Sequence, residues 1–268
     1  MNDGLSSLRK GPIGIFDSGI GGLTVFKEVR RLLPSEDICY LGDTARVPYG
    51  TKSADVVRRY AEINVRFLLD HGAKAIVVAC NTASATSIEH LLAVFPHTPI
   101  IGVIEPVARY LSHFSGKKRI GVIGTATTIG SGVYQRVLSS YGEIVAKACP
   151  LFVPLVEEGI LEHPLTFQII DYYLADMRAI GVDTLVLGCT HYPLLRKALE
   201  TYFSEGVRII DSAVPTAQAL QALLASKDLL TTSQEKGKEC FFVTDSVDFF
   251  RKSGERFLGR QIGAIEHI

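Results

Sequence analysis

Residues 77–84 read VVACNTAS, and residues 185–192 read LVLGCTHY. In both stretches an apolar run typical of a buried parallel strand gives way to a small residue, a cysteine and a polar cluster. Cys80 and Cys189 therefore stand at the carboxyl ends of two predicted strands. Parallel α/β sheets bind their ligands at that edge, so both cysteines are candidates for chemistry.

Apolar runs alternate with helix-like segments on both sides of these stretches. The first pairs are PIGIF with LTVFKEVRRLL, DICYLG with VVRRYAEINVRFLLDHG, and AIVVAC with the helix predicted over residues 84–95. This alternation predicts a doubly wound α/β fold, with mainly parallel strands and helices on both faces. After a loose polar segment at 226–239, CFFVT predicts a strand and DSVDFFRKSGERFL an amphipathic helix.

The chain also repeats itself at a coarse level. GIFDSGIGG is echoed by GVIGTATTIGSG, VPYG by VEEG, IIGVIEP by VRIIDSA, and Cys80 by Cys189, at offsets of 106 to 109 residues. Near-constant offsets predict two halves of similar topology. If the halves face each other across a cleft, one thiol approaches a bound molecule from each side, which is the arrangement that inversion at a carbon atom requires.

The composition limits the classes of function. The chain has 268 residues, of which 47% are hydrophobic, so it can bury one or two full cores. Its 28 Lys plus Arg balance 28 Asp plus Glu, which gives no general attraction to nucleic acid and favours a small-molecule ligand. The N terminus lacks a leader's apolar stretch and no run is long enough to cross a membrane, so we expect a cytoplasmic protein without membrane contact.

The five cysteines indicate neither a disulfide framework nor a metal site, because they form no CxxC pair and no ligand spacing. Cys39, Cys149 and Cys240 lack the polar flanks of the other two. We interpret these three as packing residues.

A glycine-rich turn, DSGIGG, follows the first predicted strand at Asp17 and Ser18. Its glycines let backbone N–H groups approach an anion, although Asp17 equally suits a turn or a helix cap. The turn also resembles a dinucleotide fingerprint, with Asp43 as the ribose-binding acid. Thr24 stands where a third Gly or Ala belongs, and a nicotinamide-dependent oxidoreductase would leave the paired cysteines unexplained.

Two further turns carry polar candidates. In GDTARVPYG, residues 48–50 can present backbone amides and a phenol, while Arg46 is a possible carboxylate partner that more often lies in solvent. In VPLVEEG, Glu157 and Glu158 occupy the equivalent point of the second half. His191, two residues after the second cysteine, can assist a thiol or serve only a structural role.

Taken together, FDSGIGGLTV, GDTARVPYG, VVACNTASA, IGVIEP, VPLVEEG and LGCTHYPLL resemble the glutamate racemases of the cofactor-independent aspartate/glutamate racemase family, from about Gly11 onward. The two cysteine motifs alone fit the wider superfamily, which includes aspartate racemases. DSGIGG, PYG and HYP favour glutamate. An aspartate racemase and a two-lobed amino-acid-binding protein without chemistry remain the alternatives.

The resemblance implies an enzyme that interconverts L- and D-glutamate without a cofactor or metal and supplies D-glutamate for peptidoglycan. By analogy, Cys80 takes the α-proton from the D-enantiomer and Cys189 takes it from the L-enantiomer. Asp17, Glu157 and His191 match positions that assist the thiols. The positions that match substrate-binding residues are Asp17, Ser18, Pro48, Tyr49, Gly50, Asn81, Thr82, Thr190 and His191.

The resemblance also implies two pseudo-symmetric doubly wound domains with the active site in the cleft between them. The first domain is expected to comprise residues 1–99 plus 211–268, and the second residues 100–210. A homodimer is expected, with a small molecule as substrate and no nucleic-acid partner.

Overall fold

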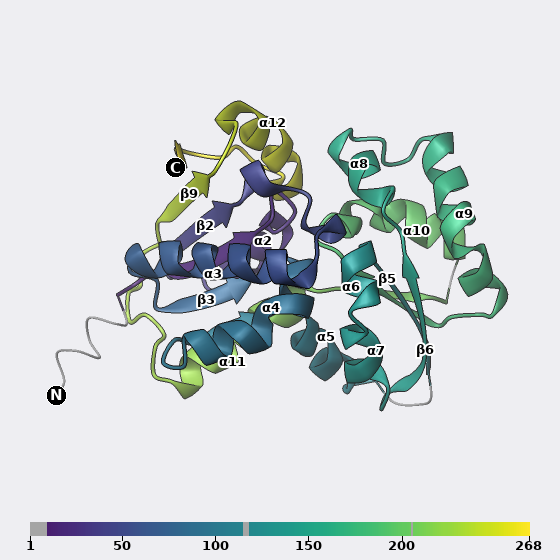
Figure 1. Cartoon of the computed structure of the whole chain (residues 1–268), viewed down its shortest axis with the longest axis horizontal. Helices are drawn as coiled ribbons and strands as arrows, with labels where there is room; N and C mark the ends of the chain where they lie inside the picture. Colours follow the sequence, from purple (N-terminus) through teal and green to yellow (C-terminus); the bar gives the residue numbers. More distant parts are fainter. Residues whose placement is uncertain (1–9, 115–117, 205) are drawn as a thin grey trace.

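The computed structural model of the chain describes residues 10–114, 118–204 and 206–268. The expectation that the N terminus carries no leader concerns chiefly residues 1–9, which lie outside the described residues. Figure 1 shows two lobes side by side, each built from a sheet and helices. We call the lobe with the six-stranded sheet the larger lobe and the lobe with the four-stranded sheet the smaller lobe.

The larger lobe has strand order β10-β9-β2-β1-β3-β4, and every neighbouring pair is parallel. Its strands alternate side chains between two cores, so that Ile15 faces one core and Phe16 the other. Helices α2, α11 and α12 supply the first core, and α3 and α4 supply the second. The bounds are β1 (Ile13–Asp17), α2 (Leu23–Leu32), β2 (Ile38–Gly42), η1 (Thr44–Arg46), η2 (Tyr49–Thr51), α3 (Ala54–Asp70), β3 (Ala75–Val78), α4 (Asn81–Val94), β4 (Ile100–Gly102), α5 (Ile104–Leu111), α11 (Ala213–Ser226), β9 (Glu239–Val243), α12 (Val247–Leu258) and β10 (Ile265–His267).

The smaller lobe has strand order β6-β5-β7-β8, again with every pair parallel. Its central strand β7 is buried along its whole length, as the apolar run TLVLG predicts. The bounds are β5 (Lys118–Gly124), α6 (Ala126–Gly130), α7 (Val133–Leu138), β6 (Gly142–Ala148), α8 (Phe152–Glu157), α9 (Pro164–Ala179), β7 (Thr184–Gly188), η3 (Tyr192–Leu195), α10 (Arg196–Phe203) and β8 (Arg208–Asp211).

The two sheets share one topology. The order β2-β1-β3-β4 in the larger lobe corresponds strand for strand to β6-β5-β7-β8 in the smaller lobe. Cys80 follows β3, and Cys189 follows its counterpart β7. The predicted doubly wound fold with two similar halves is therefore confirmed, and strands β9 and β10 extend the larger sheet beyond the shared pattern.

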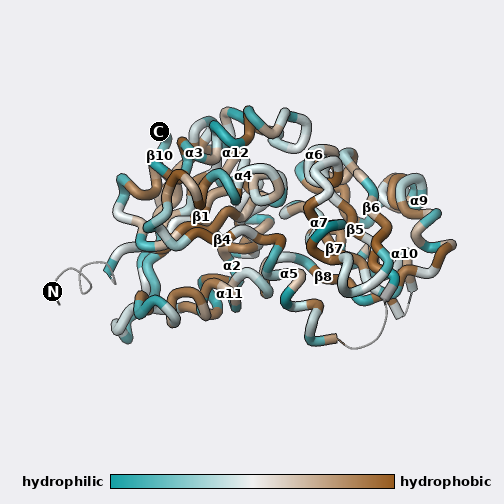
Figure 2. Tube along the Cα trace, turned by 60° about the horizontal axis from the view of Figure 1, so that its bottom comes forward, coloured by the Kyte–Doolittle hydropathy of each residue, from teal (hydrophilic) through white to brown (hydrophobic). Residues whose placement is uncertain are grey.

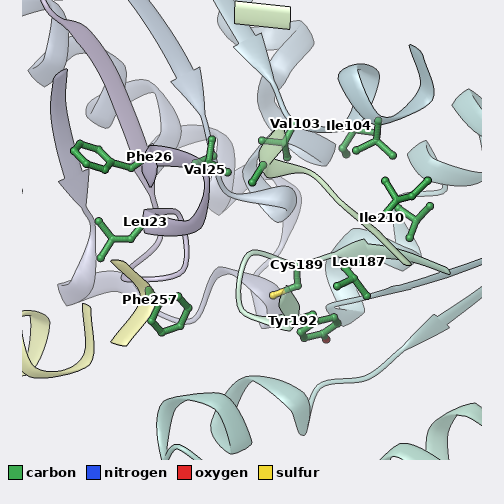
Figure 3. Close-up of a cluster of buried hydrophobic side chains, with 14 of the residues drawn as sticks. Leu23, Val25, Phe26, Val103, Ile104, Leu187, Cys189, Tyr192, Ile210 and Phe257 are labelled. Carbon is green, nitrogen blue, oxygen red and sulfur yellow. The ribbon is translucent and has the colours of Figure 1, made fainter. Parts of the chain in front are cut away.

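One hydrophobic core runs through both lobes. Figure 2 shows hydrophobic residues along the strands of each lobe. The main cluster joins Phe26 and Val103 of the larger lobe to Leu187 and Ile210 of the smaller lobe, and Figure 3 shows these side chains around the same region. Burial of this apolar surface against both sheets is the main force that holds the lobes together.

Several local predictions can be compared with the structure. The predicted C-terminal helix is confirmed as α12, whose cap Ser246 accepts a hydrogen bond from the N–H of Phe249. Helix α4 begins at Asn81, three residues before the predicted start, because its polar first turn has no apolar periodicity to reveal it. The expected domain boundaries stay a prediction. No helix in the described ranges has the length and apolar character needed to cross a membrane.

Cys39 and Cys149 are buried, as predicted for packing residues, but the same prediction is wrong for Cys240, which is exposed. Strand β9 enters the core only from Phe241 onward, so Cys240 lies at the strand's outer end.

Candidate active site

The Cys80 thiol lies at the edge of the larger sheet, where Cys80 is the cap residue of α4. Cys80 is 5% exposed, and its Sγ lies 3.8 Å from Ser18 Oγ in the glycine-rich turn after β1. Burial, together with the nearby carboxylate of Asp17, raises the pKa of the Cys80 thiol to about 12. The thiol is therefore protonated at neutral pH in the absence of a ligand.

The Cys189 thiol lies at the matching edge of the smaller sheet. Cys189 is 6% exposed and follows β7 directly. Figure 3 shows it next to Leu187 and Tyr192, with Phe257 of α12 in the same region. Charge on Cys189 contributes to the raised pKa of Cys80, so the two thiols lie within electrostatic reach of each other.

His191 connects Cys189 to a carboxylate. Its Nε2 lies 3.1 Å from Glu157 Oε1, and the neighbouring Cys189 thiol contributes to its pKa. Burial alone would lower the pKa of His191, but its interactions with Cys189 and Glu157 and the nearby charge of Asp17 together outweigh burial and raise the pKa to about 10. Glu157 therefore faces the site, whereas the neighbouring Glu158 is exposed to solvent.

This raised pKa gives a prediction about stability. We expect the free energy of unfolding to fall as pH rises from about 6.5 towards 10, because folded His191 keeps a proton that the unfolded chain releases. For one proton the slope is at most about 1.4 kcal/mol per pH unit. Urea unfolding of the wild type and of His191→Asn at several pH values in this range measures the slope of the free energy of unfolding with pH. Equal slopes in the two proteins would contradict the assignment.

Residues of α12 hold the His191–Glu157 pair from the other lobe. Arg256 Nη1 donates to the backbone carbonyls of Val156 at 3.2 Å and Glu157 at 2.9 Å. The Phe257 ring meets the His191 ring edge-on, with centroids 5.3 Å apart. The C-terminal helix thus contacts the site although the sequence places it far from both cysteines.

Asp17 lies fully buried between the lobes. Its Oδ2 accepts from the backbone N–H of Gly19 at 3.0 Å, and its Oδ1 accepts from Thr190 Oγ1 of the smaller lobe at 3.4 Å. Burial raises the pKa of Asp17, and the nearby His191 lowers it by a smaller amount. A buried carboxylate of this kind favours a cation, such as an ammonium group, beside it.

A cluster of three threonine hydroxyls joins the lobes on the Cys80 side. Thr82 Oγ1 lies 3.0 Å from Thr125 Oγ1 and 3.1 Å from Thr128 Oγ1, and the last two lie 2.9 Å apart. Thr125 and Thr128 were not among the predicted site residues. The echo between GTATTIG and the turn at Asp17 indicated this position without identifying the side chains.

Asn81 lies beside this cluster and is 2% exposed. Its Oδ1 accepts from the Tyr134 hydroxyl of the smaller lobe at 2.6 Å, while its Nδ2 has no hydrogen-bond partner among the described residues. A buried amide donor without an acceptor is costly, so the Nδ2 group is suited to receive a ligand oxygen.

The turn at 48–50 differs from the prediction in one respect. The Tyr49 phenol is not presented to a ligand, because its hydroxyl donates to Asp43 Oδ2 and accepts from Asn64 Nδ2 inside the larger lobe. The main chain after Pro48 does face the smaller lobe: a Cβ on Gly50 would lie 2.6 Å from Thr125 Cβ.

The Asp43 carboxylate has a structural role inside the larger lobe. Both of its carboxylate oxygens accept hydrogen bonds, from Tyr49, from Thr244 Oγ1 at 3.0 Å and from Arg46 Nη1 at 3.4 Å. This removes the acid that a dinucleotide ribose would need. It also places Arg46 in an ion pair rather than free in solvent.

The structure thus brings nearly all the predicted site residues to the facing edges of the two sheets. Among residues 10–114, 118–204 and 206–268, no three His, Cys, Asp or Glu side chains gather as metal ligands would. The arrangement has two buried thiols, a buried carboxylate, a His–Glu pair and a set of hydroxyl and amide donors. This set can move a proton at a small, charged substrate.

Comparison with known proteins agrees with this chemistry. A family profile described as Asp/Glu/Hydantoin racemase matches residues 17–220. A glutamate racemase of Geobacter metallireducens is 46% identical over 259 residues, covering 96% of each chain. The structure of the Francisella tularensis glutamate racemase in complex with D-glutamate superposes with a TM-score of 0.90 at 35% identity, covering 97% of this chain and 98% of that one. A glutamate racemase isoform of Bacillus anthracis gives a TM-score of 0.92 at 40% identity, with 97% and 98% coverage.

The chain therefore belongs to the Asp/Glu/hydantoin racemase family. Within that family it stands with the glutamate racemases, and it is an amino-acid racemase, an isomerase.

Proposed function

We propose that this racemase interconverts L- and D-glutamate by exchanging the α-proton between two thiols. The observation that carries the proposal is the location of Cys80 and Cys189 after equivalent strands of two lobes with the same topology. Inversion at one carbon needs a base on one face and an acid on the other, and two matched lobes supply them.

The proposed step conserves atoms and charge. With D-glutamate, the Cys80 thiolate takes the α-proton, and the electron pair of the broken C–H bond moves into the α-carboxylate. The Cys189 thiol then gives its proton to the opposite face of the carbon. L-glutamate uses the same two groups in exchanged roles, so each direction begins from the opposite pair of protonation states.

Substrate binding helps to prepare the Cys80 thiolate in this mechanism. Asp17 raises the pKa of Cys80, and its carboxylate is fully buried. A substrate ammonium placed beside Asp17 offsets that negative charge and so favours loss of the Cys80 proton. On the other side, His191, oriented by Glu157, is positioned to exchange a proton with Cys189.

The α-proton of an amino acid is very weakly acidic, so the charge that develops on the carboxylate needs stabilisation. We propose that the Asn81 amide and the hydroxyls of Ser18 and Thr82 donate to it, while the Thr190 hydroxyl holds Asp17. Each donor fixed before reaction contributes about 2.7–4 kcal/mol to lowering such barriers. Backbone N–H groups of the 48–50 turn, rather than the Tyr49 phenol, would hold the second carboxylate.

Burial of the site implies that the lobes separate to admit substrate. Asp17, Asn81 and Thr190 are each less than 5% exposed, and each takes part in a hydrogen bond between the lobes. Separation breaks these polar contacts and exposes part of the apolar cluster that joins the lobes. Closure buries that surface again and restores a water-poor site in which charge stabilisation is strongest.

Optical rotation or circular dichroism of pure L-glutamate, with no added cofactor, tests the proposal directly. We expect the signal to decay to zero from either enantiomer, and we expect aspartate in parallel to react far more slowly because its shorter chain misplaces the second carboxylate. Equal or faster turnover of aspartate would favour the alternative aspartate racemase. Binding of glutamate with no change in rotation would favour the binding-protein alternative.

The use of the product, the cellular location, the oligomeric state and the domain division are inferred together with the proposed activity. We infer that the product D-glutamate is used for peptidoglycan and that the enzyme acts in the cytoplasm as a homodimer. We also infer two domains divided near the expected boundaries, residues 1–99 with 211–268 and residues 100–210, except that β4 belongs with the first domain because it pairs with β3 in the larger sheet. Sedimentation velocity of the purified chain tests the homodimer, since a monomer sediments as about 29.2 kDa.

A further inference from the structure

Tyr134 joins the smaller lobe to the proposed carboxylate-binding residues. It belongs to α7, it is fully buried, and its hydroxyl donates to Asn81 Oδ1 across the lobe boundary at 2.6 Å. Its ring lies against the backbone next to the second thiol, because a Cβ on Gly188 would stand 3.0 Å from the ring. Burial raises the pKa of Tyr134, so the hydroxyl keeps its proton and remains a donor.

The two polar atoms of the Asn81 amide differ in their hydrogen bonding. Its Oδ1 is occupied by the Tyr134 hydroxyl, and its Nδ2 is buried with no partner among the described residues. An amide group can rotate by half a turn and exchange its oxygen and nitrogen at almost no steric cost. A substrate carboxylate needs the nitrogen facing it, because the oxygen would repel its charge.

We propose that Tyr134 is a positioning residue whose hydroxyl fixes the Asn81 amide with its Nδ2 turned towards the substrate α-carboxylate. This inference rests on the proposed function, since it assigns the ligand oxygen to glutamate. In the observed orientation the hydroxyl donates to Oδ1. A turned-over amide would let the hydroxyl accept from Nδ2 instead, but it would take away the oxygen that accepts the buried O–H proton and would turn Oδ1 towards the substrate carboxylate. The observed orientation is therefore the favoured one.

The hydrogen bond between Tyr134 and Asn81 also depends on contact between the two lobes. Tyr134 and Asn81 lie in different lobes, so the amide orientation is fixed only when the lobes are in contact. Binding of the carboxylate and closure of the site then support each other, because each is favourable only with the other in place.

Tyr134→Phe tests the inference, because it removes one oxygen and keeps the ring. We expect kcat/KM for both glutamate enantiomers to fall on the order of tenfold, mainly through a higher KM, with little change in melting temperature. In an Asn81→Ala background the same change is expected to have no further effect on KM. Additive effects in the double variant would overturn the proposal, because Tyr134 would then act independently of Asn81.

Asn81→Asp is an independent test that leaves Tyr134 intact. It keeps an oxygen for the Tyr134 hydroxyl but replaces the amide donor by a second oxygen, so KM should rise at least as much as in Asn81→Ala. A wild-type KM in Asn81→Asp would overturn the proposal. As a matched control, Tyr173→Phe removes a hydroxyl that accepts from the Leu151 N–H in the same lobe and should leave both kinetic constants unchanged.

Different results would reject the proposed racemase activity and the proposed role of Tyr134. If the wild-type chain does not racemise glutamate, the proposed function fails. If the wild type is active and Tyr134→Phe is indistinguishable from it, the proposed function stands and the role of Tyr134 is rejected.

Discussion

Cys80→Ala and Cys189→Ala are each expected to slow glutamate racemisation on the order of 10³-fold or more while leaving the fold intact. Each substitution removes one of the two proton carriers, and inversion cannot be completed from one face of the carbon. Each substitution costs the fold little, because it removes a single sulfur atom at the end of a strand and alanine keeps the Cβ. Circular dichroism with both enantiomers and a melting curve measure these effects.

Cys149→Ala is the matched control, since Cys149 is also buried but its thiol donates to the Lys147 carbonyl at 3.7 Å. It should racemise glutamate at the wild-type rate. Wild-type activity in either of the other two alanine variants would contradict the two-thiol mechanism.

Reaction in deuterium oxide adds a test of which thiol serves which enantiomer. In the wild type, turnover should place deuterium at the α-carbon of the product. In Cys80→Ala, any residual exchange should be confined to L-glutamate, which Cys189 can still reach, and in Cys189→Ala it should be confined to D-glutamate. Racemisation by the wild type without deuterium uptake would exclude proton exchange through the thiols.

The sequence was sufficient to predict the scaffold and the two thiols. The apolar runs before Cys80 and Cys189 predict buried parallel strands, and the shared offset predicts that the two strands are equivalent, as the matching sheet orders confirm. These features depend on local patterns repeated along the chain. A single short motif would not have distinguished a strand-end cysteine from a packing residue such as Cys149.

Other parts of the site depend on contacts between distant segments and could not be predicted in this way. Tyr49 belongs to a recognisable turn, but only the tertiary position of Asp43 draws its phenol away from the ligand. Arg256 and Phe257 lie in a helix whose amphipathic pattern indicates burial, not the identity of its partner. Which side chain crosses from one lobe to the other is set by the angle between the lobes, and local periodicity carries no information about that angle.

Gly21→Ala is expected to reduce racemisation roughly 10²-fold with the chain still folded. Gly21 lies in the turn between β1 and α2, and a Cβ there would stand closer than 3.0 Å to both Thr190 Oγ1 and His191 Nδ1 of the smaller lobe. Its backbone φ is not in the left-handed region, so the added methyl changes the space between the lobes and not the backbone preference.

Either route to relieving that overlap harms the site. If His191 rotates away, it leaves Cys189 or Glu157, and if the lobes separate, the bond from Thr190 to Asp17 is lost. Gly130→Ala is the control, because a Cβ at the end of α6 meets nothing within 4 Å and should leave the rate unchanged. Racemisation at the wild-type rate by Gly21→Ala would mean that the reacting enzyme does not bring Gly21 and His191 together, and the closed arrangement of the lobes would then not be the catalytic one.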